Sequence, residues 1–156
     1  MDVSALLKQF TSAVEQGDGK TFAELFAEDG VYHDAFYGAF QGRARIAELI
    51  EDWFRRTARD FRWDMFRPVS DGHTLYAYYT FSYVSLVPEA EGKRVGFDGV
   101  AMMQLSAGKI IEYREVAHTG PALLDIGFVP ERVAKIVGKE AAHMKKRPEW
   151  KRHESP

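Results

Sequence analysis

The sequence predicts one α+β domain, in which three N-terminal helices pack on a curved mixed or antiparallel sheet and a helical extension follows. Its 156 residues suit a single domain with a single core. The apolar period changes once along the chain, from the three-and-four spacing of helices to long strand-like runs. Two tight-turn signals interrupt these runs, Asp71-Gly72 and Ala107-Gly108, and such turns join antiparallel strands.

Three helices are expected in the first third of the chain, each from an apolar face at helical spacing. Their apolar faces are Val3, Leu6, Leu7, Phe10 and Val14, then Phe22, Leu25 and Phe26, then Ile46, Leu49, Ile50, Trp53 and Phe54. A short strand over about 31–34 and a loop over 36–42 separate the second helix from the third. We expect the other face of the third helix to be solvated, and it carries Arg45, Arg55, Arg56 and Arg59.

The remaining core is expected to be a meander of long strands. The four runs are residues 61–69, 75–87, 94–105 and 110–118. Beyond them an apolar stretch leads through Pro130 into a helix that ends near Met144. We expect a single domain over 1–144, with its core at 3–118 and a charged, frayed tail at 145–156.

The segment 120–144 has two open interpretations. It closes the wide end of the domain as a lid, with Phe128 facing a ligand, or it clasps the helices as a structural element. The sequence alone favours neither, because the segment is apolar enough to pack in both cases.

Composition excludes several classes of protein. The chain has 21 basic and 23 acidic side chains, a net charge of −2, which is too balanced for a protein that holds nucleic acid backbones. It has no cysteine, so disulfides and thiol chemistry are excluded. No apolar run is long enough to cross a membrane, and no spacing among the five histidines indicates a metal site. We expect a cytoplasmic protein without metal or cofactor.

The last hairpin allows side chains to be assigned to faces. A two-residue turn at 107–108 pairs Ser106 with Lys109, so positions whose numbers sum to 215 share a face. This register puts three strand residues on the helix-covered face beside Tyr113 and Glu115, namely Asp98, Val100 and Met102. The opposite face carries the charges of Glu112 and Arg114 in its middle, so we expect it to face away from the helices. Its remaining apolar surface is large, and we expect a homodimer to bury it through Tyr76, Tyr78, Ala101, Met103 and Val116.

Four short segments, in this order, resemble the nuclear transport factor 2-like superfamily, and within it the ketosteroid isomerase and SnoaL-like polyketide cyclase group. They are AVEQGD at 13–18, LFAEDGVYHD at 25–34, QGRARI at 41–46 and GKIIEYRE at 108–115. The resemblance covers residues from about 5 to 118. It implies a cone-shaped roll with a pocket between the helices and the concave sheet.

The resemblance also implies roles for individual residues. Asp34 stands where ketosteroid isomerases keep the carboxylate that moves a proton next to a carbonyl. Their two oxyanion donors, a Tyr and an Asp, correspond here to Phe10, which has no donor, and to Val100, two residues from Asp98. Glu115 resembles the last-strand acid of limonene epoxide hydrolases. By comparison with the isomerases, Tyr79 and Tyr83 line the cavity and replace the missing donor.

The residues themselves indicate acid–base chemistry. In the expected register Glu115 lies diagonal to Asp98, and two carboxyls in a dry site raise the pKa of one of them. The candidate catalytic residues are Asp34, Glu115 and Asp98. The candidate substrate-binding residues are Phe10, Tyr32, Phe54, Tyr79, Phe81, Tyr83, Val100, Met102 and Tyr113.

These candidates predict a protein that binds a small apolar molecule in a pocket. As an enzyme it is a cofactor-free isomerase, cyclase or dehydratase acting on a carbonyl or polyketide-like substrate, with Asp34 as the general base. The alternative is a non-catalytic ligand-binding or protein-interaction module that uses the same fold.

Overall fold

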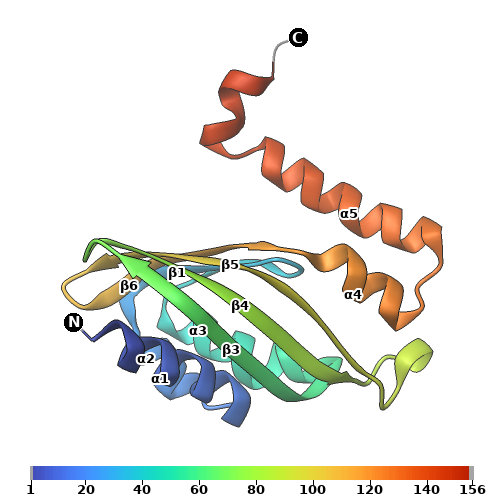
Figure 1. The fold of residues 1–156 in the computed structure, drawn as a ribbon, viewed down its shortest axis with the longest axis horizontal. Helices are drawn as coiled ribbons and strands as arrows, with labels where there is room; N and C mark the ends of the chain where they lie inside the picture. Colours follow the sequence, from blue (N-terminus) through green and yellow to red (C-terminus); the bar gives the residue numbers. More distant parts are fainter. Residues whose placement is uncertain (1, 155–156) are drawn as a thin grey trace.

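The computed structural model describes residues 2–154 and contains one curved sheet with helices on both sides (Figure 1). The N-terminal part comprises α1 (Val3–Gln16), α2 (Gly19–Glu24), β1 (Phe26–Asp34), β2 (Gly38–Gln41), α3 (Arg43–Glu48) and the turns η1 (Leu49–Trp53) and η2 (Phe54–Arg56). The sheet continues with β3 (Ala58–Ser70), β4 (Thr74–Ser85), η3 (Pro88–Ala90), β5 (Arg94–Ser106) and β6 (Lys109–Ala117). The extension contains α4 (Thr119–Ile126), α5 (Pro130–Lys145) and η4 (Pro148–His153).

The sheet has six strands in the order β2-β1-β6-β5-β4-β3. Every neighbouring pair is antiparallel except β1 and β6, which run parallel, so the sheet is mixed. Helices α1, α2 and α3 cover one face, and α5 lies on the other side (Figure 1). The predicted α+β class, with three helices on a curved sheet, is therefore confirmed.

Helix α1 forms because both of its ends are capped and one face is apolar. The Asp2 carboxylate accepts a hydrogen bond from the Ala5 amide at 3.0 Å, and Gly17 ends the helix in the left-handed conformation. The buried face carries Leu6, Leu7, Phe10, Ala13 and Val14. Phe10 is fully buried, with its ring stacked 5.3 Å from the Tyr113 ring. It belongs to the core and does not line the main pocket.

Two boundaries near the first strand differ from the prediction. β1 begins at Phe26, which was expected to end the second helix, and β2 occupies part of the expected loop. The Leu25 carbonyl accepts a hydrogen bond from the Ile110 amide at 2.9 Å, which draws this segment into the sheet. Phe22, Leu25 and Phe26 are all buried, so their apolar pattern fits both a helix and a strand. Arg59 lies on β3 and not on the third helix.

The turn of the last hairpin was predicted correctly, but the register beyond it was not. Ala107 and Gly108 both have positive φ, and Ser106 pairs with Lys109 as expected. A bulge then shifts the register by one residue between Leu105 and Gln104, so that Gln104 pairs with Glu112. The extra residue is Ile111, whose side chain is 41% exposed.

The bulge reverses the face assignment of β5, because a shift of one residue turns every later side chain to the opposite face. Ala101 and Met103 are buried under the helices, not on the outer face. Asp98, Val100 and Met102 lie on the outer face, away from Tyr113 and Glu115. Their expected place on the helix-covered face was wrong, and the reason is the bulge in the neighbouring strand.

The C-terminal extension leaves the last strand and turns to the outer side of the sheet. Helix α4 packs against β5, and its Ile126 forms a small cluster with Ala90 and Val95. Phe128 packs beside this cluster and does not line the main pocket, so the structure does not bear out Phe128 facing a ligand there. Helix α5 has no buried residue.

The tail that was expected to fray forms the short helix η4 up to His153, and residues 155–156 of that prediction lie outside the described part. Over residues 2–154, none of the helices combines the length and the apolar run that a bilayer crossing requires.

Candidate functional site

The main pocket opens between η2, the β1–β2 turn and the concave face of the sheet. Its cavity volume is about 60 Å³, so the empty pocket is a narrow slot. The lining is Tyr32, Asp34, Ala35, Phe36, Tyr37, Phe54, Thr57, Ala58, Phe61, Trp63, Tyr79, Phe81, Tyr83, Phe97 and Glu115. Aromatic rings dominate this wall, and the two carboxyl groups are its only ionisable groups apart from tyrosines.

Asp34 ends β1 and lies at the edge of the pocket. Its Oδ1 accepts hydrogen bonds from the backbone amides of Phe36 and Tyr37, both at 2.9 Å, which shape the turn into β2. Burial raises the pKa of the Asp34 carboxyl to about 6, although the two amide bonds act in the opposite direction. Asp34 is therefore a pocket carboxyl that also holds its own turn.

Glu115 lies on β6 and is held by two tyrosines. The Tyr79 hydroxyl donates to Glu115 Oε2 at 2.6 Å, and the Tyr113 hydroxyl donates to the same oxygen at 3.2 Å. Burial raises the pKa of Glu115 to about 7, and the charge of Asp34 adds to this increase. The hydrogen bonds from the two tyrosines lower it in part.

Asp34 and Glu115 form the carboxyl pair of this pocket. Because each carboxylate disfavours a second charge close by, the two groups titrate together and not independently. Burial raises both pKa values, so the pair keeps a proton to a higher pH than two exposed carboxyls do. A site of this kind offers an ionised base and a protonated donor at the same pH.

The three tyrosines near Glu115 stay protonated over the same range. Burial is the main cause that raises the pKa of Tyr79, and the charge of Glu115 raises it further. Tyr32 and Tyr113 are fully buried with stacked rings 4.4 Å apart, and burial raises the pKa of both phenols. These hydroxyls therefore act as donors and not as bases.

Gly99 makes the contact between Tyr79 and Glu115 possible. It pairs with Tyr79 across β4 and β5. A Cβ at this position would lie 2.6 Å from the Tyr79 hydroxyl and 2.5 Å from the Val116 carbonyl oxygen. Only glycine leaves room for the phenol here. The sequence analysis did not identify Gly99, because its role depends on the register of the two strands.

The structure brings most of the predicted pocket residues together. Tyr32, Phe54, Tyr79, Phe81 and Tyr83 line the pocket with Asp34 and Glu115. Tyr113 lies behind this lining, where it reaches Glu115 through its hydroxyl.

Several lining residues were missed by the sequence analysis, among them Phe61, Trp63 and Phe97. Phe61 and Trp63 are alternate residues of β3 and both are buried. Their alternation with charged neighbours was a signal that could have placed them on the inner face.

Asp98 lies outside this constellation. It is on the outer face of the sheet, where its Oδ2 accepts from the Tyr78 hydroxyl at 3.0 Å and its Oδ1 lies 3.3 Å from His118 Nδ1. The expected pair of Asp98 and Glu115 does not exist, and Asp34 takes the place of Asp98. In the part of the chain that the structure describes, no group of three or more His, Asp or Glu side chains has the arrangement of a metal site.

Comparison with known proteins agrees with this geometry. The SnoaL-like domain family matches residues 7–113, more than half of the chain. Among curated proteins, none matches.

Solved structures share the fold at low sequence identity. One is an uncharacterised protein with a ketosteroid isomerase-like fold from Catenulispora acidiphila, in complex with trimethylamine (TM-score 0.71, 13% identity, covering 81% of this chain and 95% of that one). An epoxide hydrolase from M. tuberculosis, described as LEH-like, has a TM-score of 0.63 at 19% identity over 86% and 94% of the chains. A proposed polyketide cyclase from Pseudomonas putida has a TM-score of 0.62 at 22% identity over 78% and 95%. The family match over residues 7–113, on a fold that these structures share, shows that the chain belongs to the SnoaL-like domain family.

Proposed function

We propose that the pocket binds a small, mostly apolar carbonyl compound and moves a proton at the carbon next to the carbonyl, as a cofactor-free isomerase, cyclase or dehydratase does. One observation carries this proposal. Two carboxyl groups with raised pKa values share an aromatic pocket, and one of them is held by tyrosine hydroxyls. Burying two carboxyls in an apolar wall costs folding free energy, so a use for them is expected.

In this proposal Asp34 is the general base, because the backbone amides hold it through Oδ1 alone, whereas two tyrosine hydroxyls hold Glu115. It takes the proton from the carbon, and the electron pair of the broken C–H bond moves to the carbonyl oxygen. Protonated Glu115 donates a hydrogen bond to that developing oxyanion. Asp34 then returns the proton to a second carbon. In the cyclase case the enolate carbon attacks another carbonyl within the substrate, and Asp34 returns the proton to the alkoxide oxygen that this attack creates.

The surrounding residues support these roles. The two backbone amides bind Asp34 through Oδ1, so Oδ2 is the oxygen that this mechanism uses for the substrate proton. The hydroxyls of Tyr79 and Tyr113 orient Glu115 through Oε2. The aromatic rings of the pocket suit a flat substrate. They also exclude water, and hydrogen bonds inside the pocket are stronger because water is absent.

The comparisons support the same reaction class at a coarse level. The family match and the fold shared with a proposed polyketide cyclase fit proton chemistry next to a carbonyl. The fold shared with an epoxide hydrolase favours a different use of the acids, the activation of water. We favour carbonyl chemistry, because the closest hydrogen-bond partner of the Glu115 carboxyl is the Tyr79 hydroxyl and not a second carboxyl group.

A second candidate function is ligand binding without turnover. The two amide bonds to Asp34 favour it, because a carboxylate that closes a turn is useful to the fold alone. In that case the pocket binds its ligand and Asp34 only shapes the β1–β2 turn.

The two candidates differ in whether the protein exchanges protons of a bound ketone. We would incubate the protein with 2-tetralone in D₂O and follow the loss of the protons next to the carbonyl by NMR. We expect exchange faster than in protein-free buffer, and Asp34→Asn to slow the protein-dependent rate by about 10²–10⁴-fold. Asp98→Asn is the matched control, since it makes the same change on the outer face and leaves the rate unchanged.

Binding of 2-tetralone without accelerated exchange would decide for the non-catalytic candidate. Full activity of the Asp34→Asn variant would remove Asp34 from the mechanism. The folded state of each variant is checked by its thermal unfolding before the rates are compared.

A further inference from the structure

Trp63 is the exception among the buried polar side chains of the pocket wall. Its side chain is 4% exposed, and it lines the pocket together with Phe61 and Phe81. Among the buried side-chain nitrogen and oxygen atoms of residues 2–154, the indole Nε1 of Trp63 lacks a hydrogen-bond partner. A buried N–H without an acceptor lowers stability, and such groups call for an explanation.

The surroundings of this indole are aromatic. Its ring lies 5.0 Å from the Phe81 ring, 5.3 Å from the Phe10 ring and 5.7 Å from the Tyr79 ring, measured between centroids. The backbone amide of Trp63 does have a partner, because it donates to Glu15 Oε1 at 2.8 Å. The missing partner therefore concerns only the indole N–H.

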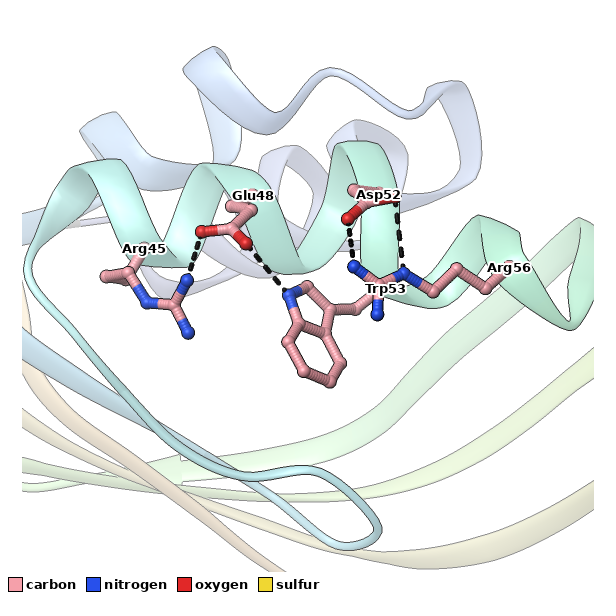
Figure 2. A network of polar contacts seen from close by, with 5 residues as sticks. All are labelled: Arg45, Glu48, Asp52, Trp53 and Arg56. Carbon is pink, nitrogen blue, oxygen red and sulfur yellow. Dashed lines mark hydrogen bonds and ion pairs between the residues drawn. The ribbon is translucent and has the colours of Figure 1, made fainter.

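Trp53 shows what this chain does with an indole that serves the fold. Its Nε1 donates to Glu48 Oε1 at 3.1 Å, and the other oxygen of Glu48 pairs with Arg45 (Figure 2). The bond from Trp53 is the largest of the causes that lower the pKa of Glu48. Trp53 therefore has a charged acceptor for its indole N–H, whereas the buried indole N–H of Trp63 has none.

We propose that the indole N–H of Trp63 is the hydrogen-bond donor that positions the pocket's ligand, and that this ligand carries a second oxygen acceptor besides its reacting carbonyl. This inference rests on the proposed function, because it assumes that a carbonyl compound occupies the pocket. The substrate class becomes a flat, dioxygenated compound such as a dicarbonyl or an oxygen-substituted aromatic ketone. One oxygen faces the carboxyl pair and the other accepts from Trp63.

The narrow slot is consistent with this arrangement. Since about 60 Å³ is open in the empty pocket, a ring-sized ligand has to move the aromatic side chains apart as it enters. Because Nε1 is buried in the structure, a hydrogen bond from it to a ligand requires the neighbouring rings to move. A ligand oxygen satisfies this N–H without displacing an existing hydrogen bond of the protein, so the contact favours binding.

The test compares 2-tetralone with its 5-, 6- and 7-methoxy derivatives, which add one acceptor at three places on the ring. We expect at least one methoxy derivative to bind wild-type protein fivefold or more tightly than 2-tetralone, and Trp63→Phe to abolish this preference. In ¹⁵N-labelled protein the Trp63 indole N–H resonance should move downfield with that derivative. The Trp53 indole resonance is the internal control and should stay in place.

The outcomes separate this inference from the proposed function. Proton exchange of the ketones without a Trp63 shift, or an equal methoxy preference in Trp63→Phe, would overturn the role of Trp63 and leave the proton chemistry standing. A Trp63 shift without exchange would support Trp63 and contradict catalysis. Binding of none of the four ketones would overturn both. If Trp63→Phe fails to fold, 3-benzothienylalanine at position 63 keeps the shape and replaces the N–H by sulfur.

Discussion

The two faces of the sheet carry the same pair of chemical groups in different surroundings. On the inner face the Tyr79 hydroxyl donates to Glu115 at 2.6 Å, and on the outer face the Tyr78 hydroxyl donates to Asp98 at 3.0 Å. The two tyrosines are neighbours in β4. Tyr79 is fully buried, whereas Tyr78 is 38% exposed.

The difference between the two pairs lies in solvation. The pKa of Tyr79 is raised mainly by burial, and that of Tyr78 mainly by its hydrogen bond to Asp98. Burial also raises the pKa of Glu115 to about 7. A phenol–carboxyl pair is thus an exposed contact on one side of the strand and a buried contact in the pocket wall on the other, and the alternation of side chains along the strand decides which.

The largest expected difference between the inner and the outer groups is in the pH dependence of the free energy of unfolding. Asp34 and Glu115 have raised pKa values in the folded protein, so the folded state holds more protons than the unfolded chain between about pH 4 and 7. The free energy of unfolding should therefore fall as the pH rises through this window, by about 2–3 kcal/mol for each carboxyl. Urea unfolding from pH 4 to pH 8 measures this.

The double variant Asp34→Asn/Glu115→Gln should lose this fall and stay nearly level over the same window. Asp98→Asn should keep the wild-type profile, since it alters only the outer pair. A double variant with an unchanged profile would show that the inner carboxyls are not the groups that titrate.

A smaller effect comes from deleting each tyrosine hydroxyl in turn. Tyr79→Phe leaves a buried carboxyl without its shortest hydrogen bond and should lower the free energy of unfolding by about 1–3 kcal/mol. Since that bond lowers the pKa of Glu115, the pKa should rise above about 7 in the variant. Urea unfolding and ¹³C NMR titration of the glutamate carboxyl measure the two effects.

Tyr78→Phe is the matched variant on the outer face. It should change stability by less than about 0.5 kcal/mol, because exposed contacts of this kind contribute little. Equal losses for the two variants would contradict the idea that burial separates the two pairs.

Substitutions on the outer face are expected to have the smallest effect on the stability of the domain. They are expected to change its assembly. This face exposes Val69, Tyr76, Tyr78, Val100 and Val116. We propose that a second copy of the chain covers it, because a cluster of exposed apolar side chains on one face is typical of an interface. Ala101 and Met103, which the expected register assigned to this face, are buried inside the domain.

Val116, which is 61% exposed, tests the assembly. Val116→Glu should convert a dimer into a monomer in sedimentation velocity, with little change in thermal unfolding of the domain. Leu124→Glu changes a side chain of similar exposure, 63%, on α4 and should leave the dimer intact. A wild-type protein that sediments as a monomer at micromolar concentration would refute the proposed interface.

How far the site could be predicted is clearest at Asp34 and Asp98. Asp34 was placed in the pocket by the resemblance to ketosteroid isomerases, and in the structure it lines the pocket. Asp98 was assigned to the same face by counting back from the turn, which is valid only while the ladder stays regular. The bulge at Ile111 broke the count within three residues, and apolar residues on both faces of β5 hid the change.

What the sequence determined by itself is local: the apolar periods of the helices and strands, the two hairpin turns, and the acids and aromatic residues that a pocket needs. These follow from side-chain spacing and turn chemistry, which act over a few residues. Tertiary structure alone decided which acids meet. Asp34 and Glu115 share the pocket because β1 runs parallel to β6, and Gly99 leaves room for the Tyr79 hydroxyl to reach Glu115. Pairings of this kind join residues far apart in the chain, and a single inserted residue reverses them, so local patterns cannot specify them.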